Sequence, residues 1–221
     1  MPIRFPSRNL TRLAGPLDGH LAGRLAACAA LAALLAAAAL PAAAQPDFLV
    51  GARAGYADLS GSGLYDEVYD GGVTTLGLQA EARWPAFSLR LAAEQADADG
   101  DLFIPDVVGG GNVLPGSAVE LSLDLYHLTA AYNGGGAGPW GWFAGGGVSF
   151  ADAEEDGILG RRSNSATGFH AAGGVRRALG PRWELGGEIL YYTISDLLEV
   201  EGLVTDDLEG IAGAATLSFA F

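Results

Sequence analysis

The amino-acid sequence predicts an all-β fold: an eight-stranded antiparallel up-and-down transmembrane β-barrel that follows a cleaved N-terminal signal peptide. Three observations predict it. Runs of about 10 to 14 residues alternate apolar with polar or small side chains, which exceeds the ~5–6 residues of most soluble strands and suits a tilted membrane strand. The connections between the runs are alternately long and short, as in barrels that cross a membrane. The last run ends on Phe221 without a polar tail.

Residues 1–44 are expected to be a signal peptide that takes no part in the fold. Arginines up to Arg24 precede an apolar run from Leu25 to Leu40, and small residues follow as far as Ala44. A basic start, a short apolar run and an A-x-A cleavage site are typical of secretory signals. The run is also shorter than the roughly 20 residues that a membrane helix needs. We therefore expect residues 45–221 to form the barrel domain, without disulfides because the one cysteine lies in the leader.

The first three runs show the alternation most clearly. In residues 47–56 every second residue from Phe48 to Tyr56 is apolar, and residues 74–84 and 87–94 repeat the pattern. Five similar runs follow, near residues 119–132, 140–151, 167–177, 182–194 and 210–221. Because side chains alternate between the faces of a strand, each run has one apolar and one polar face.

Runs two, four and six end in short links, at Pro85, in "NGGGAGP" and in "LGP" ending at Pro181. Polar stretches of ~14 to 24 residues follow the odd-numbered runs, so long loops gather at one rim of the barrel and short turns at the periplasmic rim. All four tryptophans lie beside the short links, and we expect them to form one aromatic belt at the periplasmic interface. They are Trp84, Trp140, Trp142 and Trp183.

The fourth run does not keep one apolar parity. Leu121, Leu123 and Leu125 share one face, whereas Tyr126 and the apolar residues after it lie on the opposite one. A β-bulge near Leu125 would bring both halves to the same side of the barrel, so the register of this strand near Leu125 stays open at this point.

The polar parity of the runs carries Gly, Ala and charges of both signs, which suits the interior of an eight-stranded barrel. An Arg on the lipid face would cost about 2–4 kcal/mol at mid-depth, which disfavours a soluble barrel with its apolar face inside. Buried charges must be paired, so we expect a charge network that plugs the lumen. Its predicted members are Arg53, Glu81, Arg83, Arg90, Glu94, Asp124, Arg176, Glu184 and Glu188.

In the last run, Leu217, Phe219 and Phe221 share one face. We expect this face to meet lipid and the strand to pair with the first run, which leaves no open edge.

The order of these features resembles that of the small eight-stranded outer-membrane barrels, such as OmpX and the transmembrane domain of OmpA. The resemblance is carried by the signal peptide, the eight alternating runs, "RWELGGEILYY" and the terminal Phe221. It implies that the barrel assembly machinery recognises Leu217, Phe219 and Phe221 as an assembly signal. It also implies a location in the outer membrane of a Gram-negative cell.

Composition and motifs give little support to other functions. The formal charge is −14 and every basic residue is Arg, so nucleic acid is not an expected partner. The deacylase motif H-x-S-N of some lipid A-modifying barrels is not kept at His127, which Thr129 and Ala130 follow. His170 has lumen parity, and we expect it to be a hydrogen-bonded wall residue. No catalytic residue and no cofactor is expected.

A weak candidate for a metal site is the "DADGDLF" stretch, with Asp97, Asp99 and Asp101 at alternate positions. A calcium loop of the EF-hand type needs Gly at its sixth and Glu at its twelfth position, where this chain has Leu102 and Val108. We therefore expect a solvated acidic loop.

The function that these patterns favour is structural. We expect a monomeric outer-membrane protein with a plugged lumen and long acidic loops that meet lipopolysaccharide or a host partner, with a role in membrane integrity, adhesion or host interaction. The alternatives are a narrow pore for small solutes or ions, and a lipid A-modifying enzyme.

Overall fold

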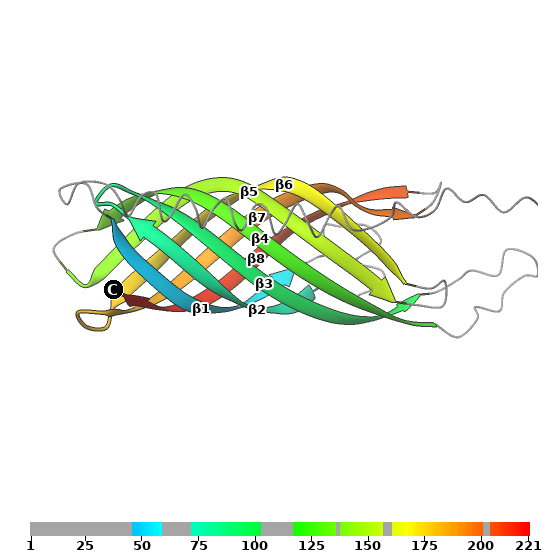
Figure 1. The fold of residues 1–221 in the computed structure, drawn as a ribbon, viewed down its shortest axis with the longest axis horizontal. Helices are drawn as coiled ribbons and strands as arrows, with labels where there is room; N and C mark the ends of the chain where they lie inside the picture. Colours follow the sequence, from blue (N-terminus) through cyan, green and yellow to red (C-terminus); the bar gives the residue numbers. More distant parts are fainter. Residues whose placement is uncertain (1–45, 59–71, 103–116, 136–137, 157–160, 201–203) are drawn as a thin grey trace, which may run out of the picture.

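The computed structural model describes residues 46–58, 72–102, 117–135, 138–156, 161–200 and 204–221, which form one closed antiparallel barrel (Figure 1). Its strands are β1 (Asp47–Asp58), β2 (Gly72–Arg83), β3 (Phe87–Leu102), β4 (Ser117–Gly135), β5 (Trp140–Asp156), β6 (Arg162–Ala178), β7 (Trp183–Val200) and β8 (Val204–Ala220). Each strand pairs with its neighbours in the sequence, and β8 pairs with β1. This confirms the predicted fold class. Within the described residues no helix is long and apolar enough to cross a membrane.

Most strands extend further than the alternating runs predicted, mainly toward the rim with the long connections. β3 continues to Leu102, where the run ended at residue 94, and β7 continues to Val200. The acidic residues Asp97, Asp99 and Asp101, which we expected in a loop, therefore lie on β3. Much of the predicted long connections, and the predicted signal peptide, lie outside the described residues.

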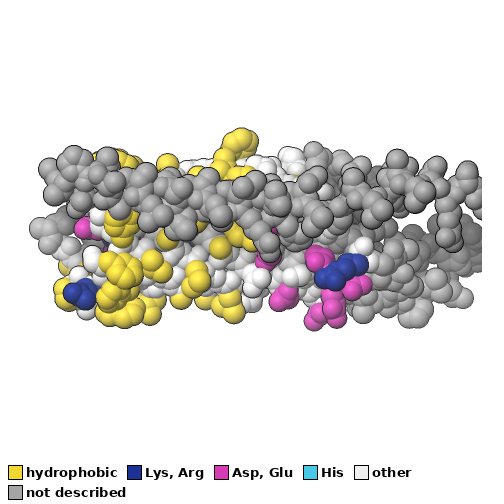
Figure 2. Space-filling model, viewed as in Figure 1, with side chains coloured by type: hydrophobic (Ala, Val, Ile, Leu, Met, Phe, Trp, Pro, Cys, Tyr) yellow, Lys and Arg dark blue, Asp and Glu magenta, His cyan; other side chains and the backbone are white. Residues whose placement is uncertain are grey.

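The extensions escaped prediction because the barrel exchanges the polarity of its two faces along its length. Toward the short connections, apolar side chains such as Leu76 and Leu78 point outward and are 64% and 66% exposed. Toward the long connections, the outer wall carries carboxylates and apolar side chains point inward. Figure 2 shows the hydrophobic and acidic side chains gathered toward opposite ends.

Strand β4 contains this exchange within one regular strand. Leu123 and Leu125 point into the barrel and are buried, whereas Tyr132, on the opposite parity, is 60% exposed on the outer face. Its register with β3 and with β5 is unbroken from end to end. The register that the sequence left open near Leu125 is therefore regular, without a bulge: the inward side chains change from polar to apolar where the outer wall changes from apolar to acidic. A register shift lies instead between β7 and β8, between Ile194 and Leu198.

The closing strand places its aromatic side chains on the outer face. In the β1–β8 ladder Phe219 lies opposite Val50, and the amide of Phe221 donates a hydrogen bond of 3.1 Å to the carbonyl of Phe48. The rings of Trp183 and Phe221 contact the Phe219 ring edge to face, with centroids 5.1 and 5.4 Å away. The C-terminus thus lies beside the start of β1, at the rim with the short connections (Figure 1).

Candidate functional site: the barrel interior

A network of buried ion pairs occupies the interior toward the short connections. Arg53 from β1 lies 2.6 Å from Glu94 of β3 and 2.6 Å from Glu188 of β7. The second carboxylate oxygen of Glu188 accepts a hydrogen bond from Arg90 at 2.5 Å. Side-chain exposure is 2% for Arg53 and 4% for both glutamates, so this part of the lumen is dry. Strands far apart in the sequence are held together across the lumen by these pairs.

A second group of charges lies closer to the short-turn rim. Glu81 pairs with Arg83 at 2.9 Å and with Arg176 at 3.1 Å, and it lies 3.8 Å from Arg90, which joins the two groups. Arg83 also pairs with Glu184 at 2.8 Å, and both side chains are 19% exposed. The described network therefore contains four arginines and four glutamates and carries no net charge.

Phe143 is a member of this layer that the sequence analysis did not identify. Its buried ring lies beneath two guanidinium groups, with the Cζ atoms of Arg90 and Arg176 at 4.2 and 5.3 Å from the ring centroid. A Cβ on the facing Gly174 would lie 2.6 Å from ring atoms of Phe143, so only glycine leaves room for the ring. The sequence signal that could have identified it is a single Phe on the polar face of its run, paired with a glycine on the next run.

The two histidines of the barrel meet inside it. The Ser149 hydroxyl lies 2.9 Å from Nδ1 of His127 and 2.9 Å from Nδ1 of His170, and Thr129 Oγ1 lies 2.9 Å from Nε2 of His170. His127 Nε2 lies 3.7 Å from Glu94. Glu94, His127 and Ser149 follow one another as the acid, base and nucleophile do in a catalytic triad. Ser149 is 0% exposed, however, and so cannot meet a substrate. The chain of hydrogen bonds instead joins β4, β5 and β6 to the charge network.

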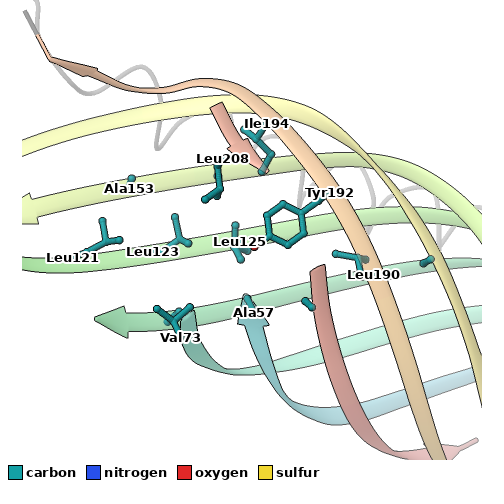
Figure 3. Packing of buried hydrophobic residues seen from close by; sticks show 14 of the residues in the cluster. Ala57, Val73, Leu121, Leu123, Leu125, Ala153, Leu190, Tyr192, Ile194 and Leu208 are labelled. Atoms are coloured by element: carbon teal, nitrogen blue, oxygen red, sulfur yellow. The ribbon is translucent and has the colours of Figure 1, made fainter. Parts of the chain in front are cut away.

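Beyond the histidines, toward the long connections, the interior is apolar. Leu123, Leu190, Ile194 and Leu208 are no more than 2% exposed and point toward one another across the lumen (Figure 3). Tyr192 lies among them and is also fully buried. The interior therefore has two layers, an ion-paired layer within the apolar outer band and a hydrophobic layer above it.

One predicted member of the charge network lies elsewhere. Asp124 points outward from β4, where its carboxylate accepts a hydrogen bond of 2.9 Å from Gln95 of β3. The prediction that Asp124 faces the lumen is wrong, because its apolar neighbours Leu123 and Leu125 are interior residues. The other eight predicted members are brought together.

The weak metal candidate is a strand segment and not a loop. Asp97 and Asp99 alternate along the outer face of β3, and Asp101 follows in the same strand. Among the described residues, no group of three or more His, Cys, Asp or Glu is placed to hold a metal ion.

The four tryptophans all lie at the rim with the short connections. Trp140, Trp142 and Trp183 are about half exposed, at 57%, 45% and 49%, and Trp84 stacks on Phe87 with ring centroids 4.5 Å apart. At the same rim a pocket of about 430 Å³ opens into the barrel. Arg83 and Glu184 lie at this pocket, so water reaches the first ion pair of the network from this side.

Comparison with known proteins gives the fold a family. The family model described as outer membrane protein beta-barrel domain matches residues 27–221. The structure is similar to that of surface protein A of Neisseria, with 18% identity, a TM-score of 0.53, and coverage of 79% of this chain and 97% of that one. It is also similar to the outer membrane protein OprG of Pseudomonas aeruginosa, with 14% identity, a TM-score of 0.55, and coverage of 80% and 96%. At these identities the likeness extends to the fold alone. No curated protein sequence matches the chain.

Proposed function

Because the chain belongs to the outer membrane protein beta-barrel domain family, we propose that it is an outer-membrane barrel with a closed lumen, which acts through its outer surface. In this proposal the short connections are periplasmic, as is general for such barrels, and the acidic wall faces the outside of the cell.

The observation that carries the proposal is the two-layered interior. Side-chain exposure falls from 19% at Arg83 and Glu184, beside the periplasmic pocket, to 2% at Arg53. Above Arg53 the hydrophobic layer begins, with Leu123 at 1% and Leu208 at 0% exposure. An ion crossing this barrel would have to open the paired charges and then pass an apolar section, each of which opposes a hydrated ion.

The experiment is conductance in a planar lipid bilayer. The purified protein, shown to be folded by its heat-modifiable mobility in gels, is expected to give no steady channels in neutral salt solution. Reproducible open channels from the same folded preparation would contradict the closed lumen and favour the narrow pore.

The acidic outer wall supports a surface role. Carboxylates lie directly opposite one another across the ladders, as in Asp124 with Asp152, Glu120 with Asp156, and Asp99 with Glu120. Like charges in such positions oppose strand pairing by roughly 0.2–1 kcal/mol per pair. A wall that keeps them in spite of this cost suits contact with cationic partners, or with lipopolysaccharide through divalent cations, in adhesion or membrane integrity.

This role is tested in a strain that lacks the protein. Complementation with the native chain is compared with a variant in which Asp99, Glu120, Asp152 and Asp156 become Asn or Gln. The native chain is expected to restore adhesion, serum survival or detergent resistance, and the neutral variant to fail at equal surface level. Equal restoration by both would show that the acidity serves solvation only. A mass change in lipid A on expression would instead support the enzyme alternative.

A further inference from the structure

Two arginines at the short-turn rim lie on the outer surface. Arg177 points outward near the end of β6, and Arg182 lies in the turn before β7. The guanidinium of Arg177 lies over the Trp140 ring, with its Cζ 5.3 Å from the centroid, and that of Arg182 lies 5.8 Å over the Phe219 ring. Each ring fixes the position of one charge without neutralising it.

These two charges have no carboxylate partner among the described residues, unlike the other arginines whose side chains the structure describes. Arg53, Arg83, Arg90 and Arg176 are paired inside the barrel, and Arg161, at the opposite end, contacts Glu154. Asp47 lines the rim pocket together with Arg182, but no ion pair joins them in the described structure. The guanidinium N–H groups of Arg177 and Arg182 therefore remain available to an anion.

The surroundings of the two arginines are those of a lipid headgroup. Trp140 and Trp183 belong to the aromatic belt, and such belts lie at headgroup depth. Leu185 lies opposite Arg177 in the β6–β7 ladder and opposite Leu217 in the β7–β8 ladder. Both leucines are exposed on the outer face, at 47% and 44%. The two guanidinium groups lie apart, one over β5 and the other over β8, and a phosphate at either of them would have this apolar surface beside it for its acyl chains.

We propose that this outer surface, with Arg177 at its β5 side, Arg182 at its β8 side and Leu185 and Leu217 between them, binds anionic phospholipids of the periplasmic leaflet. The planar guanidinium groups donate hydrogen bonds to the phosphodiester oxygens, while the rings hold the groups at headgroup depth. Phosphatidylglycerol carries a net negative charge, whereas the ammonium of phosphatidylethanolamine offsets its phosphate. The site therefore favours phosphatidylglycerol. This inference rests on the proposed orientation, in which the short turns are periplasmic.

The test is native mass spectrometry of the full-length protein in detergent micelles, titrated with phosphatidylglycerol or with phosphatidylethanolamine. Each arginine near a membrane surface contributes about 1 kcal/mol to binding an anionic lipid. Because each phosphate meets one of the two guanidinium groups, the double variant Arg177→Gln/Arg182→Gln should lose about 5-fold in phosphatidylglycerol affinity, which corresponds to about 1 kcal/mol, with little change for phosphatidylethanolamine. The matched control Arg161→Gln/Arg162→Gln makes the same change in net charge at the other end and should bind like the native chain. Heat-modifiable mobility shows that each variant is folded.

Equal affinity of the native chain for the two lipids, or equal loss in both double variants, would overturn the site. Orientation is checked separately, by labelling a Ser122→Cys variant in whole cells with a membrane-impermeant maleimide. If position 122 is labelled and phosphatidylglycerol binding is unselective, the lipid site is wrong and the proposed function stands. If position 122 is labelled only after permeabilisation, the proposed orientation is wrong and the lipid inference falls with it.

Discussion

Replacing Glu188 with glutamine is expected to destabilise the barrel strongly. Its two oxygens lie 2.6 Å from Arg53 and 2.5 Å from Arg90, and its side chain is 4% exposed. Breaking a buried ion pair by removing one partner costs about 3–5 kcal/mol, because the remaining charge stays buried. Arg53 would keep Glu94, but Arg90 would keep only Glu81 at 3.8 Å. We therefore expect a loss of about 3–5 kcal/mol in the free energy of unfolding.

The matched control is Glu184→Gln. Glu184 also pairs with an arginine, but both side chains are 19% exposed at the pocket, and Arg83 keeps Glu81. Because water screens this pair, we expect a loss of about 1 kcal/mol or less. The assay is reversible urea unfolding in lipid vesicles, followed by the fluorescence of the four tryptophans. Equal losses for the two variants, or a loss below about 1 kcal/mol for Glu188→Gln, would refute the dry ion-paired layer.

Three further outcomes are expected. Leu123→Ala should lower the free energy of unfolding by about 2–5 kcal/mol because Leu123 is 1% exposed in the hydrophobic layer. The control Ser122→Ala on the outer wall should change it by no more than about 0.5 kcal/mol. The same unfolding assay checks both variants, and similar values would mean that the layer is not packed. Asp152→Asn should stabilise the barrel by roughly 0.2–1 kcal/mol because Asp152 faces Asp124. Salt screens this repulsion, so the gain in stability should vanish at high salt. A gain that persists at high salt would show that repulsion between the two carboxylates is not its cause. Phe221→Asp should sharply lower the amount of protein in the outer membrane without blocking export to the periplasm, and cell fractionation measures both amounts. A normal level in the outer membrane would contradict the role of Leu217, Phe219 and Phe221 as an assembly signal.

The strand order and the ion-paired layer could be predicted from the sequence because both depend on the alternation of apolar and polar side chains along each strand. Within the membrane, lipid requires apolar side chains outside, so Arg53, Glu81 and Glu188 could be placed inside by parity alone. The pairing of particular residues could not be predicted. Glu188 meets Arg53 across 135 positions of sequence, and only the register of the closed barrel brings them together.

The errors share one cause, which is that the solvent outside the barrel changes along each strand. The prediction took apolar parity to mean lipid-facing everywhere, so Leu121, Leu123 and Leu125 were turned outward and Asp124 inward. Where the wall meets water, the same parity marks a hydrophobic interior. The histidine cluster was missed for another reason: His127, Ser149 and His170 lie on three different strands and become neighbours only through the ladders.

The most direct test of the account is a single-cysteine scan along β4 in whole cells, which is free of background because the sequence has no cysteine after position 28. With a membrane-impermeant maleimide, we expect labelling at the outer-wall positions 120, 122 and 124 only. The interior positions 121, 123 and 125 should stay unlabelled because they are buried at 2% exposure or less, and positions 128, 130 and 132 because lipid covers them. Labelling at 121, 123 and 125 in place of 120, 122 and 124 would indicate a bulge near Leu125. Labelling at both sets of positions would show an open lumen. Either result would contradict the closed barrel with exchanged polarity.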